Sequence, residues 1–218
     1  MNDVKKKILI VEDHPIVARG LAQLINKQPE LTVLSIASSA HMAIESIKKD
    51  NPDMVTLDIS LKDSNGLELI KDINLEFKHI PILVISMHDE NVYAERAIKA
   101  GAKGYIMKEK VSKELLKAIY QVLNGKIYLS NKMSSIILNK SIKGEVDNTP
   151  VDLLSDRELE VLEYVGEGLT TREIAGKTNL GIKTIETYKS KIKEKLELKN
   201  SNQLIKFAVE WLIKNKSL

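Results

Sequence analysis

Four short apolar runs in the first half of the chain each end in polar side chains that could take part in chemistry. The runs are continuous and are separated by segments with helical spacing, which is typical of strands in a parallel α/β sheet buried on both faces. Ligands of such sheets bind beyond the carboxyl ends of the strands, so the side chains there should converge. They are Glu12 and Asp13 after residues 8–11, Asp58 after 55–57, Ser86 after 82–85 and Lys108 after 104–107.

Three of these converging side chains are carboxylates, and carboxylates in one crevice repel one another. A hard divalent cation such as Mg²⁺ offsets this repulsion and binds through a few carboxylates and water molecules. Asp58 alone would be a weak indication, because an aspartate at a strand end is commonly a solvated loop residue or a helix cap. Ser86 and Lys108, taken singly, would also be solvated strand ends. The agreement of four strand ends predicts a cation site.

The composition indicates a soluble globular protein with one large or two ordinary domains, since 43% of its 218 residues are hydrophobic and 29% are charged. A net charge of +3 is too small to indicate a class of partner, and the absence of cysteine excludes disulfides, thiol catalysis and cysteine-ligated zinc. Without a long apolar run or a secretory segment, we expect a cytoplasmic protein with no membrane span. Four histidines lack metal-ligand spacing and are interpreted as surface or loop residues: His14, His41, His79 and His88.

Strands and helices alternate through residues 1–125, which predicts an α/β domain with a flavodoxin-like, doubly wound, five-stranded parallel sheet. Pro15 suits the first turn of a helix, Gly101 suits a helix end, and Ser112 can cap the last helix. Strands are predicted at 8–11, 31–37, 55–58, 82–86 and 104–107. Helices are predicted at 15–25, 40–49, 67–77, 91–100 and 113–123.

Beyond Gly125 this alternation stops. A linker is predicted at 126–152, with a helix at 131–142 and then a polar stretch that contains Gly144 and Pro150. Residues 153–218 are predicted to form a small all-α domain of four helices that contains a helix-turn-helix. These helices are 155–166, 170–178, 182–196 and 201–213, and two begin with capping boxes, Ser155 with Glu158 and Thr170 with Glu173.

Five short motifs occur in order along the chain: Val11-Glu12-Asp13-His14-Pro15, the loop from Asp58 to Gly66, Ser86-Met87-His88-Asp89-Glu90, Gly101-Ala102-Lys103-Gly104-Tyr105, and the stretch from Leu154 to Leu162. In these motifs the chain resembles the NarL/FixJ subfamily of two-component response regulators. Residues 1–125 resemble the receiver domain, and residues 153–218 resemble the LuxR-type helix-turn-helix domain. The resemblance covers almost the whole chain.

The resemblance implies that Asp58 is a phosphoacceptor and that Mg²⁺ binds beside it. The metal would be held by Glu12, Asp13, Asp58 and the backbone carbonyl of Ser60. The chemistry of the residues agrees, because a carboxylate nucleophile needs the charge of the incoming phosphoryl oxygens neutralised, which Mg²⁺ and Lys108 can do.

Two further roles follow from the resemblance. Ser86 would hydrogen-bond the new phosphoryl group, and Tyr105 would be a switch aromatic whose inward or outward rotamer follows Ser86. The alternative for Tyr105 is a half-buried aromatic on an edge strand. Lys62, next to Asp63, stands where many receivers have proline, and the lost φ restriction should loosen the loop and alter the lifetime of the phosphorylated state.

The predicted helix 182–196 corresponds to the recognition helix that enters the major groove of double-stranded DNA. Its lysines alone would equally suit a solvated helix face. Gly181 replaces a frequent serine cap, Tyr188 replaces a common histidine, and Glu186 is acidic where several relatives carry lysine, so no relative's base preference can be transferred. The predicted DNA-facing residues are Lys183, Thr184, Glu186, Thr187, Lys189, Ser190 and Lys191.

The final helix carries more apolar surface than so small a domain is expected to bury. Following the family, we interpret part of it as a homodimer interface, against the alternative that it packs entirely within the domain. This surface comprises Gln203, Leu204, Phe207, Ala208, Trp211 and Leu212. The predicted domain core comprises Val161, Leu162, Ile174, Ala175, Leu180, Ile185, Ile192 and Leu196.

These features predict a DNA-binding response regulator. A sensor histidine kinase would phosphorylate Asp58, and the protein would then pair as a homodimer on two DNA half-sites, with RNA polymerase as a further partner.

The competing interpretation is a Mg²⁺-dependent phosphohydrolase with Asp58 as nucleophile. That enzyme needs a second acid soon after the nucleophile, where Ser60 stands and for which Asp63 is a poor substitute, so we expect no turnover beyond slow self-dephosphorylation. A regulator that works without phosphate is disfavoured, because every position of the acidic pocket, formed by Glu12, Asp13 and Asp58, carries a carboxylate.

Overall fold

The computed structural model describes residues 5–61, 64–143 and 149–215. The predictions for Lys62 and Asp63, and those for residues 144–148 of the linker, lie outside the described residues. The chain divides into two compact units, residues 1–135 and 136–218.

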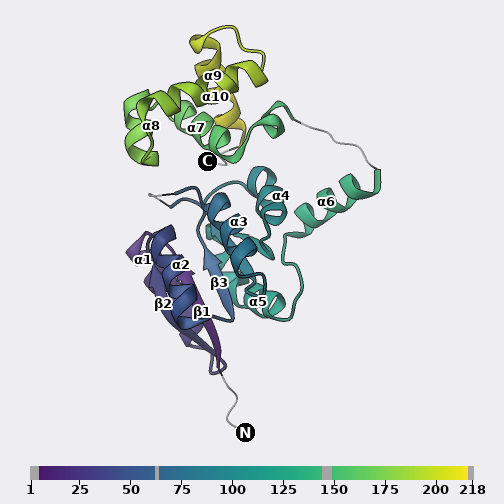
Figure 1. Ribbon diagram of the computed structural model, residues 1–218. Coiled ribbons are helices and arrows are strands. Elements are labelled where there is room, and N and C mark those ends of the chain that lie inside the picture. The colour runs from purple at the N-terminus through teal and green to yellow at the C-terminus, as the bar shows by residue number, and fades with distance from the viewer. Residues whose placement is uncertain (1–4, 62–63, 144–148, 216–218) are drawn as a thin grey trace. The chain divides into compact units, whose positions relative to one another are not determined.

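The first unit contains a five-stranded parallel sheet with the strand order β2-β1-β3-β4-β5, which confirms the predicted doubly wound fold (Figure 1). The order reverses direction between β1 and β3, and such a switch point is where doubly wound sheets bind ligands. Register aligns the strand ends there, because Val11 pairs with Leu57 and Leu57 pairs with Val84. The strands are β1 (Lys6–Val11), β2 (Leu31–Ala37), β3 (Met54–Leu57), β4 (Ile82–Ser86) and β5 (Gly104–Met107).

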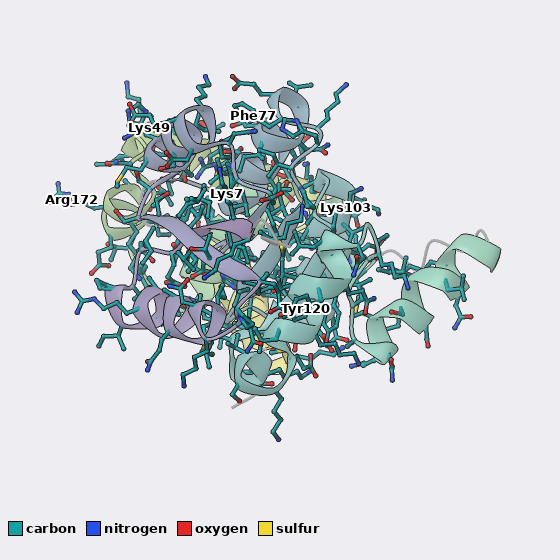
Figure 2. The ribbon with its side chains drawn as sticks, turned by 90° about the horizontal axis from the view of Figure 1, so that it is seen from below. Lys7, Lys49, Phe77, Lys103, Tyr120 and Arg172 are labelled. Atoms are coloured by element: carbon teal, nitrogen blue, oxygen red, sulfur yellow. The ribbon has the colours of Figure 1, made fainter. Side chains whose placement is uncertain are left out.

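Helices cover both faces of this sheet. Figure 2 looks along it from the side of Lys7, with Lys49 and Phe77 on one side of the sheet and Tyr120 on the other. One face packs against α1 and α5 through a continuous apolar cluster that includes Ile8. The helices are α1 (Pro15–Asn26), α2 (Ala40–Asp50), α3 (Gly66–Glu76), α4 (Glu90–Ala100) and α5 (Val111–Leu123).

Two of the three predicted helix-end residues are confirmed, and one prediction is wrong. Pro15 is the first residue of α1, and Gly101 ends α4 with a φ of 120°. Ser112 is not a cap, because α5 begins one residue earlier, directly after the 3₁₀ turn η1 (Lys108–Lys110). Lys110, which precedes α5, is already in helical conformation, so the chain offers Ser112 no extended cap position.

The second unit is helical, as predicted, and contains both predicted capping boxes. Six of the eight predicted core residues are buried, while Leu180 in a turn and Leu196 at the end of α9 are half-buried. The predicted helix at 131–142 is present as α6 (Asn131–Lys143), which spans the division between the units. The remaining elements are η2 (Pro150–Leu153), α7 (Asp156–Gly166), α8 (Thr171–Thr178), α9 (Ile182–Lys195) and α10 (Ser201–Asn215).

The predicted dimer surface on α10 is partly packed inside the unit, while Gln203 is exposed and Phe207, Trp211 and Leu212 are half-buried. Leu204 and Ala208 are buried within the unit, because α7 crosses α10 closely at Gly166, where an added Cβ would lie 2.7 Å from the Ala208 carbonyl oxygen. The exposed apolar side chains of α10 lie on another stripe of the helix. They are Ile205, Val209 and Ile213.

Glu158 connects the start of α7 to the end of α9. It is 3% exposed, and its Oε2 accepts hydrogen bonds from Lys195 Nζ at 2.6 Å and from the Ser155 backbone N–H at 2.8 Å. Burial alone would raise the pKa of Glu158, but these hydrogen bonds outweigh burial and hold that pKa below its usual value. The charged form of Glu158 therefore stabilises the second unit.

We expect Glu158→Gln to lower the free energy of unfolding of this unit by about 1–3 kcal/mol at pH 7, as the loss of a hydrogen-bonded charge should. Because the folded-state pKa is depressed, this stabilisation is complete above pH 4.5 and is lost as the pH falls through the folded-state pKa. Urea unfolding followed by fluorescence of Trp211, the single tryptophan, should show the variant and wild type converging below pH 4.5. A difference that stays constant with pH would contradict this role, and the exposed Glu194→Gln is the control.

Candidate functional site

The ends of β1 and β3 bring three carboxylates together. Glu12 and Asp58 directly follow the paired residues Val11 and Leu57, and each is only 2% exposed. Ligand atoms of Glu12, Asp13, Asp58 and also His14 all lie within 4.8 Å of one another. The predicted convergence at the carboxyl ends of the strands is therefore present for all three acids.

Lys108, at the end of β5, lies between two of these acids. Its Nζ is 2.7 Å from Asp58 Oδ2 and 2.6 Å from Glu12 Oε2. Burial disfavours the ammonium form, but attraction to Asp58 and Glu12 and the hydrogen bonds to them outweigh burial and raise the pKa of Lys108. Lys108 therefore stays charged and offsets part of the negative charge of the site.

The loop after Asp58 is held close to the strand end. The Ser60 backbone N–H donates to Asp58 Oδ1 at 3.1 Å. Asn65 caps α3 by accepting from the Leu67 and Glu68 backbone N–H groups. At Gly66 an added Cβ would lie 2.3 Å from the Ile59 Cα, so only glycine permits this approach of α3 to the loop.

Ser86 and Tyr105 meet at His88. The Ser86 side chain is fully buried, and its Oγ accepts from the His88 backbone N–H at 3.1 Å. Tyr105 points inward, is 2% exposed and donates its hydroxyl hydrogen to the His88 carbonyl oxygen at 2.8 Å. It is thus fully buried rather than half-buried, and the same short segment contacts both side chains.

In the second unit, α8, a turn and α9 form a helix-turn-helix. Asn179 makes the turn with a φ of 57°, and Gly181 precedes α9 without a side-chain cap bond. Ile185 and Ile192 are buried on one side of α9. On its other side, exposed residues include six of the predicted DNA-facing set: Lys183, Thr184, Glu186, Thr187, Ser190 and Lys191.

Lys189, the seventh of that set, is half-buried. Its Nζ donates to the Thr171 Oγ1 at 3.0 Å, which ties α9 to the first residue of α8. Burial lowers the pKa of Lys189, and Glu186 partly opposes that shift. Lys191 is therefore the more exposed of the two lysines for an anionic partner.

A family model for the response regulator receiver domain matches residues 8–120, and one for bacterial regulatory proteins of the luxR family matches residues 152–208. The chain belongs to the response regulators with a LuxR-type DNA-binding domain. It is a two-component, DNA-binding transcription regulator. The resemblance to the NarL/FixJ subfamily is thereby confirmed.

Relatives of this response regulator match it along nearly the whole chain. The oxygen regulatory protein NreC of Staphylococcus haemolyticus is 30% identical over 210 residues, which are 94% of this chain and 97% of that protein. NreC of Staphylococcus carnosus is 31% identical with the same coverage.

Solved structures of RcsB are also similar. One, of RcsB from Salmonella enterica serovar Typhimurium bound to promoter rprA in the presence of the phosphomimetic BeF3⁻, has a TM-score of 0.67 at 26% identity and covers 94% of this chain and 98% of that chain. Another, a structure of two RcsB dimers bound to two parallel DNAs, has a TM-score of 0.58 at 25% identity, with the same coverage.

In the described part of this chain, none of the helices combines the length and the apolar character that a membrane span requires.

The sequence interpretation of this response regulator missed His14. Its Nδ1 lies 2.8 Å from Asp13 Oδ1 and 3.0 Å from Glu12 Oε1, and its backbone N–H donates to Glu12 Oε1 at 3.1 Å. His14 is therefore at the mouth of the acidic pocket and is not an ordinary loop residue. Its position directly after Glu12 and Asp13 was the available signal.

Proposed function

We propose that a sensor histidine kinase transfers a phosphoryl group to Asp58, and that this modification switches sequence-specific DNA binding. The observation that carries the proposal is the position of the Asp58 carboxylate. It lies at the switch point of the sheet, 2% exposed, with Lys108 at 2.7 Å from one oxygen and the Ser60 N–H at 3.1 Å from the other. A nucleophile held between two donors is oriented for in-line attack on phosphorus.

The acidic pocket suits a hard divalent cation, because its donors are carboxylate oxygens. Mg²⁺ would be held by Glu12, Asp13, Asp58 and the backbone carbonyl of Ser60. When bound, it supplies positive charge that neutralises the transferring phosphoryl oxygens. Asp58 forms the new P–O bond as the P–N bond to the kinase histidine breaks, and Lys108 stabilises the anionic product.

Ser86 and Tyr105 would then report the modification. Ser86 is the last residue of β4, which pairs with the strand that precedes Asp58, and its hydroxyl can donate to a phosphoryl oxygen. Tyr105 points inward, and its hydroxyl donates a hydrogen bond to the His88 carbonyl oxygen, so a movement of His88 would change the rotamer of Tyr105. We propose these two residues as the switch.

The output would be the docking of α9 in the major groove of DNA, with the two copies of a homodimer on paired half-sites. The apolar surface of α10 available for pairing comprises the half-buried Phe207, Trp211 and Leu212 of the predicted interface and the exposed Ile205, Val209 and Ile213. The proposed DNA contacts are Lys183, Thr184, Glu186, Thr187, Lys189, Ser190 and Lys191.

We propose a receiver domain at 1–125, a linker at 126–152 and a DNA-binding domain at 153–218.

The same proposal places the protein in the cytoplasm, with a sensor histidine kinase, DNA and RNA polymerase as partners. It assigns no enzymatic activity beyond slow self-dephosphorylation. Ser60, two residues after Asp58, supplies an N–H to the carboxylate and not the second acid of a phosphohydrolase. Steady-state turnover of small phosphomonoesters would contradict this assignment.

Selection from a random duplex pool, with a small phosphodonor and Mg²⁺ present, tests the whole proposal. Full-length protein should enrich two copies of one motif about one helical turn, or a multiple of it, apart. Enrichment should weaken when Mg²⁺ is chelated. Recovery of no common sequence under either condition would overturn the proposed function.

We expect Lys191→Ala to weaken binding to all DNA sequences about equally and to lower the slope of log K against log salt by about one unit, because a phosphate contact is lost. Thr187→Ala should instead change base preference. Fluorescence anisotropy titrations over a range of salt concentrations measure both effects. Lys214→Ala, on exposed surface of α10, is the matched control. An unchanged slope for Lys191→Ala would show that the recognition helix is wrongly placed.

We also expect a fragment beginning near Val151 to bind DNA without phosphorylation, at least as tightly as the unphosphorylated full-length protein. The physical reason is that an unphosphorylated receiver docked on the output domain would compete with DNA. Gel-shift titration of both proteins on one duplex measures the comparison. Weaker binding by the fragment would mean that the receiver activates the output domain by supplying dimerisation.

A further inference from the structure

The start of the linker packs on the edge of the receiver sheet. The Tyr128 backbone N–H donates to the Lys103 carbonyl oxygen, and the Tyr105 backbone N–H donates to the Tyr128 carbonyl oxygen, each at 2.9 Å. Tyr128 thereby forms a parallel bridge with Gly104, where an added Cβ would lie 3.0 Å from the Tyr128 carbonyl oxygen. Because β5 is the last strand of the sheet, Tyr128 occupies hydrogen-bonding groups that would otherwise be at a free edge.

Side chains fix the same segment further. The Tyr128 hydroxyl donates to Glu114 Oε2 at 3.1 Å, and burial together with this acceptor raises the pKa of Tyr128 to about 12. The hydroxyl therefore remains a donor at neutral pH. Met133, in the first turn of α6, is 1% exposed. The beginning of α6 is thus part of the receiver's packing.

Ser130 connects this segment to α4. It directly precedes α6, and its Oγ accepts from the Met133 backbone N–H at 3.1 Å, which is the arrangement of a helix cap. The same hydroxyl donates to Glu90 Oε1 at 3.0 Å. Glu90 is the first residue of α4, is 8% exposed and has Lys110 Nζ at 3.7 Å from the same oxygen.

Two short routes lead from the Asp58 pocket to this contact. In the first, Ser86 Oγ binds the His88 N–H, the His88 carbonyl binds the Tyr105 hydroxyl, and the Tyr105 N–H binds Tyr128. In the second, the chain passes from His88 to Glu90 and across to Ser130. The hydrogen bonds thus join the segment 86–90 to the start of α6 both through Tyr105 and Tyr128 and through Glu90 and Ser130.

We propose that Glu90 and Ser130 are positioning residues that couple the phosphorylation state of Asp58 to the first turn of α6. The inference rests on the proposed function, because it requires Ser86 to turn toward a phosphoryl group. When the Ser86 hydroxyl turns to donate its hydrogen to that group, the Oγ moves away from the His88 N–H, and the segment 86–90 shifts. The Glu90–Ser130 bond then breaks, and the start of α6 is released from the receiver.

Hydrogen–deuterium exchange on full-length protein tests this coupling, with intact mass measured on the same samples to follow the phosphoryl adduct. With Mg²⁺ and acetyl phosphate, the segment 131–134 in wild type should exchange about 5- to 10-fold faster at its hydrogen-bonded amides, those of Met133 and Ser134, than without the phosphodonor, as expected for loss of one hydrogen bond. In Ser130→Ala and Glu90→Ala the exchange should be fast without phosphate and should change less than about 2-fold on phosphorylation. Ser134→Ala, an exposed residue of the same turn, should behave like wild type.

The two variants separate coupling from capping, because Glu90→Ala keeps the Ser130 cap and removes the contact of Ser130 with α4, together with the Lys110 contact at 3.7 Å. If Ser130→Ala alters exchange while Glu90→Ala behaves like wild type, Ser130 is only a cap and the coupling is overturned. If wild type carries the adduct but exchange at 131–134 does not change, the coupling is overturned while Asp58 remains the phosphoacceptor. If no adduct forms, the proposed function fails and the coupling fails with it.

Discussion

Asp58→Asn is expected to abolish the covalent phosphoryl adduct, which is the largest effect predicted for any single substitution in this protein. The amide keeps the size of the side chain but is neutral and a far weaker nucleophile. Glu12 and Asp13 keep their carboxylates in the variant, so the loss of the adduct would assign the phosphoacceptor to Asp58 and not to its acidic neighbours. Intact mass spectrometry should show a gain of roughly 80 Da, the mass of one phosphoryl group, in wild type only.

The reaction should also require Mg²⁺. Three carboxylates face the incoming anion, and the ammonium of Lys108 offsets only part of their charge. Chelation should therefore reduce the wild-type adduct to the level of the variant. Asp72→Asn, the same chemical change on exposed surface of α3, is the control. An undiminished adduct in Asp58→Asn would refute the assignment of the phosphoacceptor.

The sheet and the acidic pocket could be predicted because their signals are local and repeated. The strands β1, β3 and β5 are short apolar runs, and each is directly followed by a residue whose side chain lies in the pocket. In a parallel sheet the strand ends are aligned, and because Val11 lies opposite Leu57, the residues that follow them, Glu12 and Asp58, come together. Lys108 was predictable for the same reason, although its simultaneous contact with both acids was not.

The features that could not be predicted from the sequence depend on single contacts between elements, which leave no periodic pattern of residues. The pairing of Tyr128 with Gly104 is a single bridge, which leaves no alternating pattern in the sequence. Ser112 was wrongly assigned as a cap because a 3₁₀ turn runs directly into α5. On α10, helical spacing identified an apolar face but could not show that α7 covers Ala208 and leaves Ile205 exposed.

Lys108→Met should destabilise the receiver by about 3–5 kcal/mol in the presence of a chelator. The substitution keeps most of the side-chain volume but leaves Glu12 and Asp58, each 2% exposed, without the ammonium that now lies within 2.7 Å of both. Removing one partner of a buried ion pair leaves an uncompensated charge, which typically costs that much. Native-state hydrogen exchange of the buried amides of β1 and β3 measures the free energy of opening. Lys103→Met, on exposed surface before β5, is the matched control.

Two further dependences distinguish charge compensation from simple packing. Because the pKa of Lys108 is raised above 10.5, its contribution should be complete below pH 10.5 and should be lost only as the pH rises through the folded-state value. The difference between wild type and variant should therefore persist from pH 7 to pH 10. Millimolar Mg²⁺ should restore most of the lost stability, because a divalent cation can replace the ammonium between the carboxylates. If Lys108→Met is as stable as wild type in chelator, or if Mg²⁺ stabilises both proteins equally, then Lys108 does not hold the carboxylates together by charge.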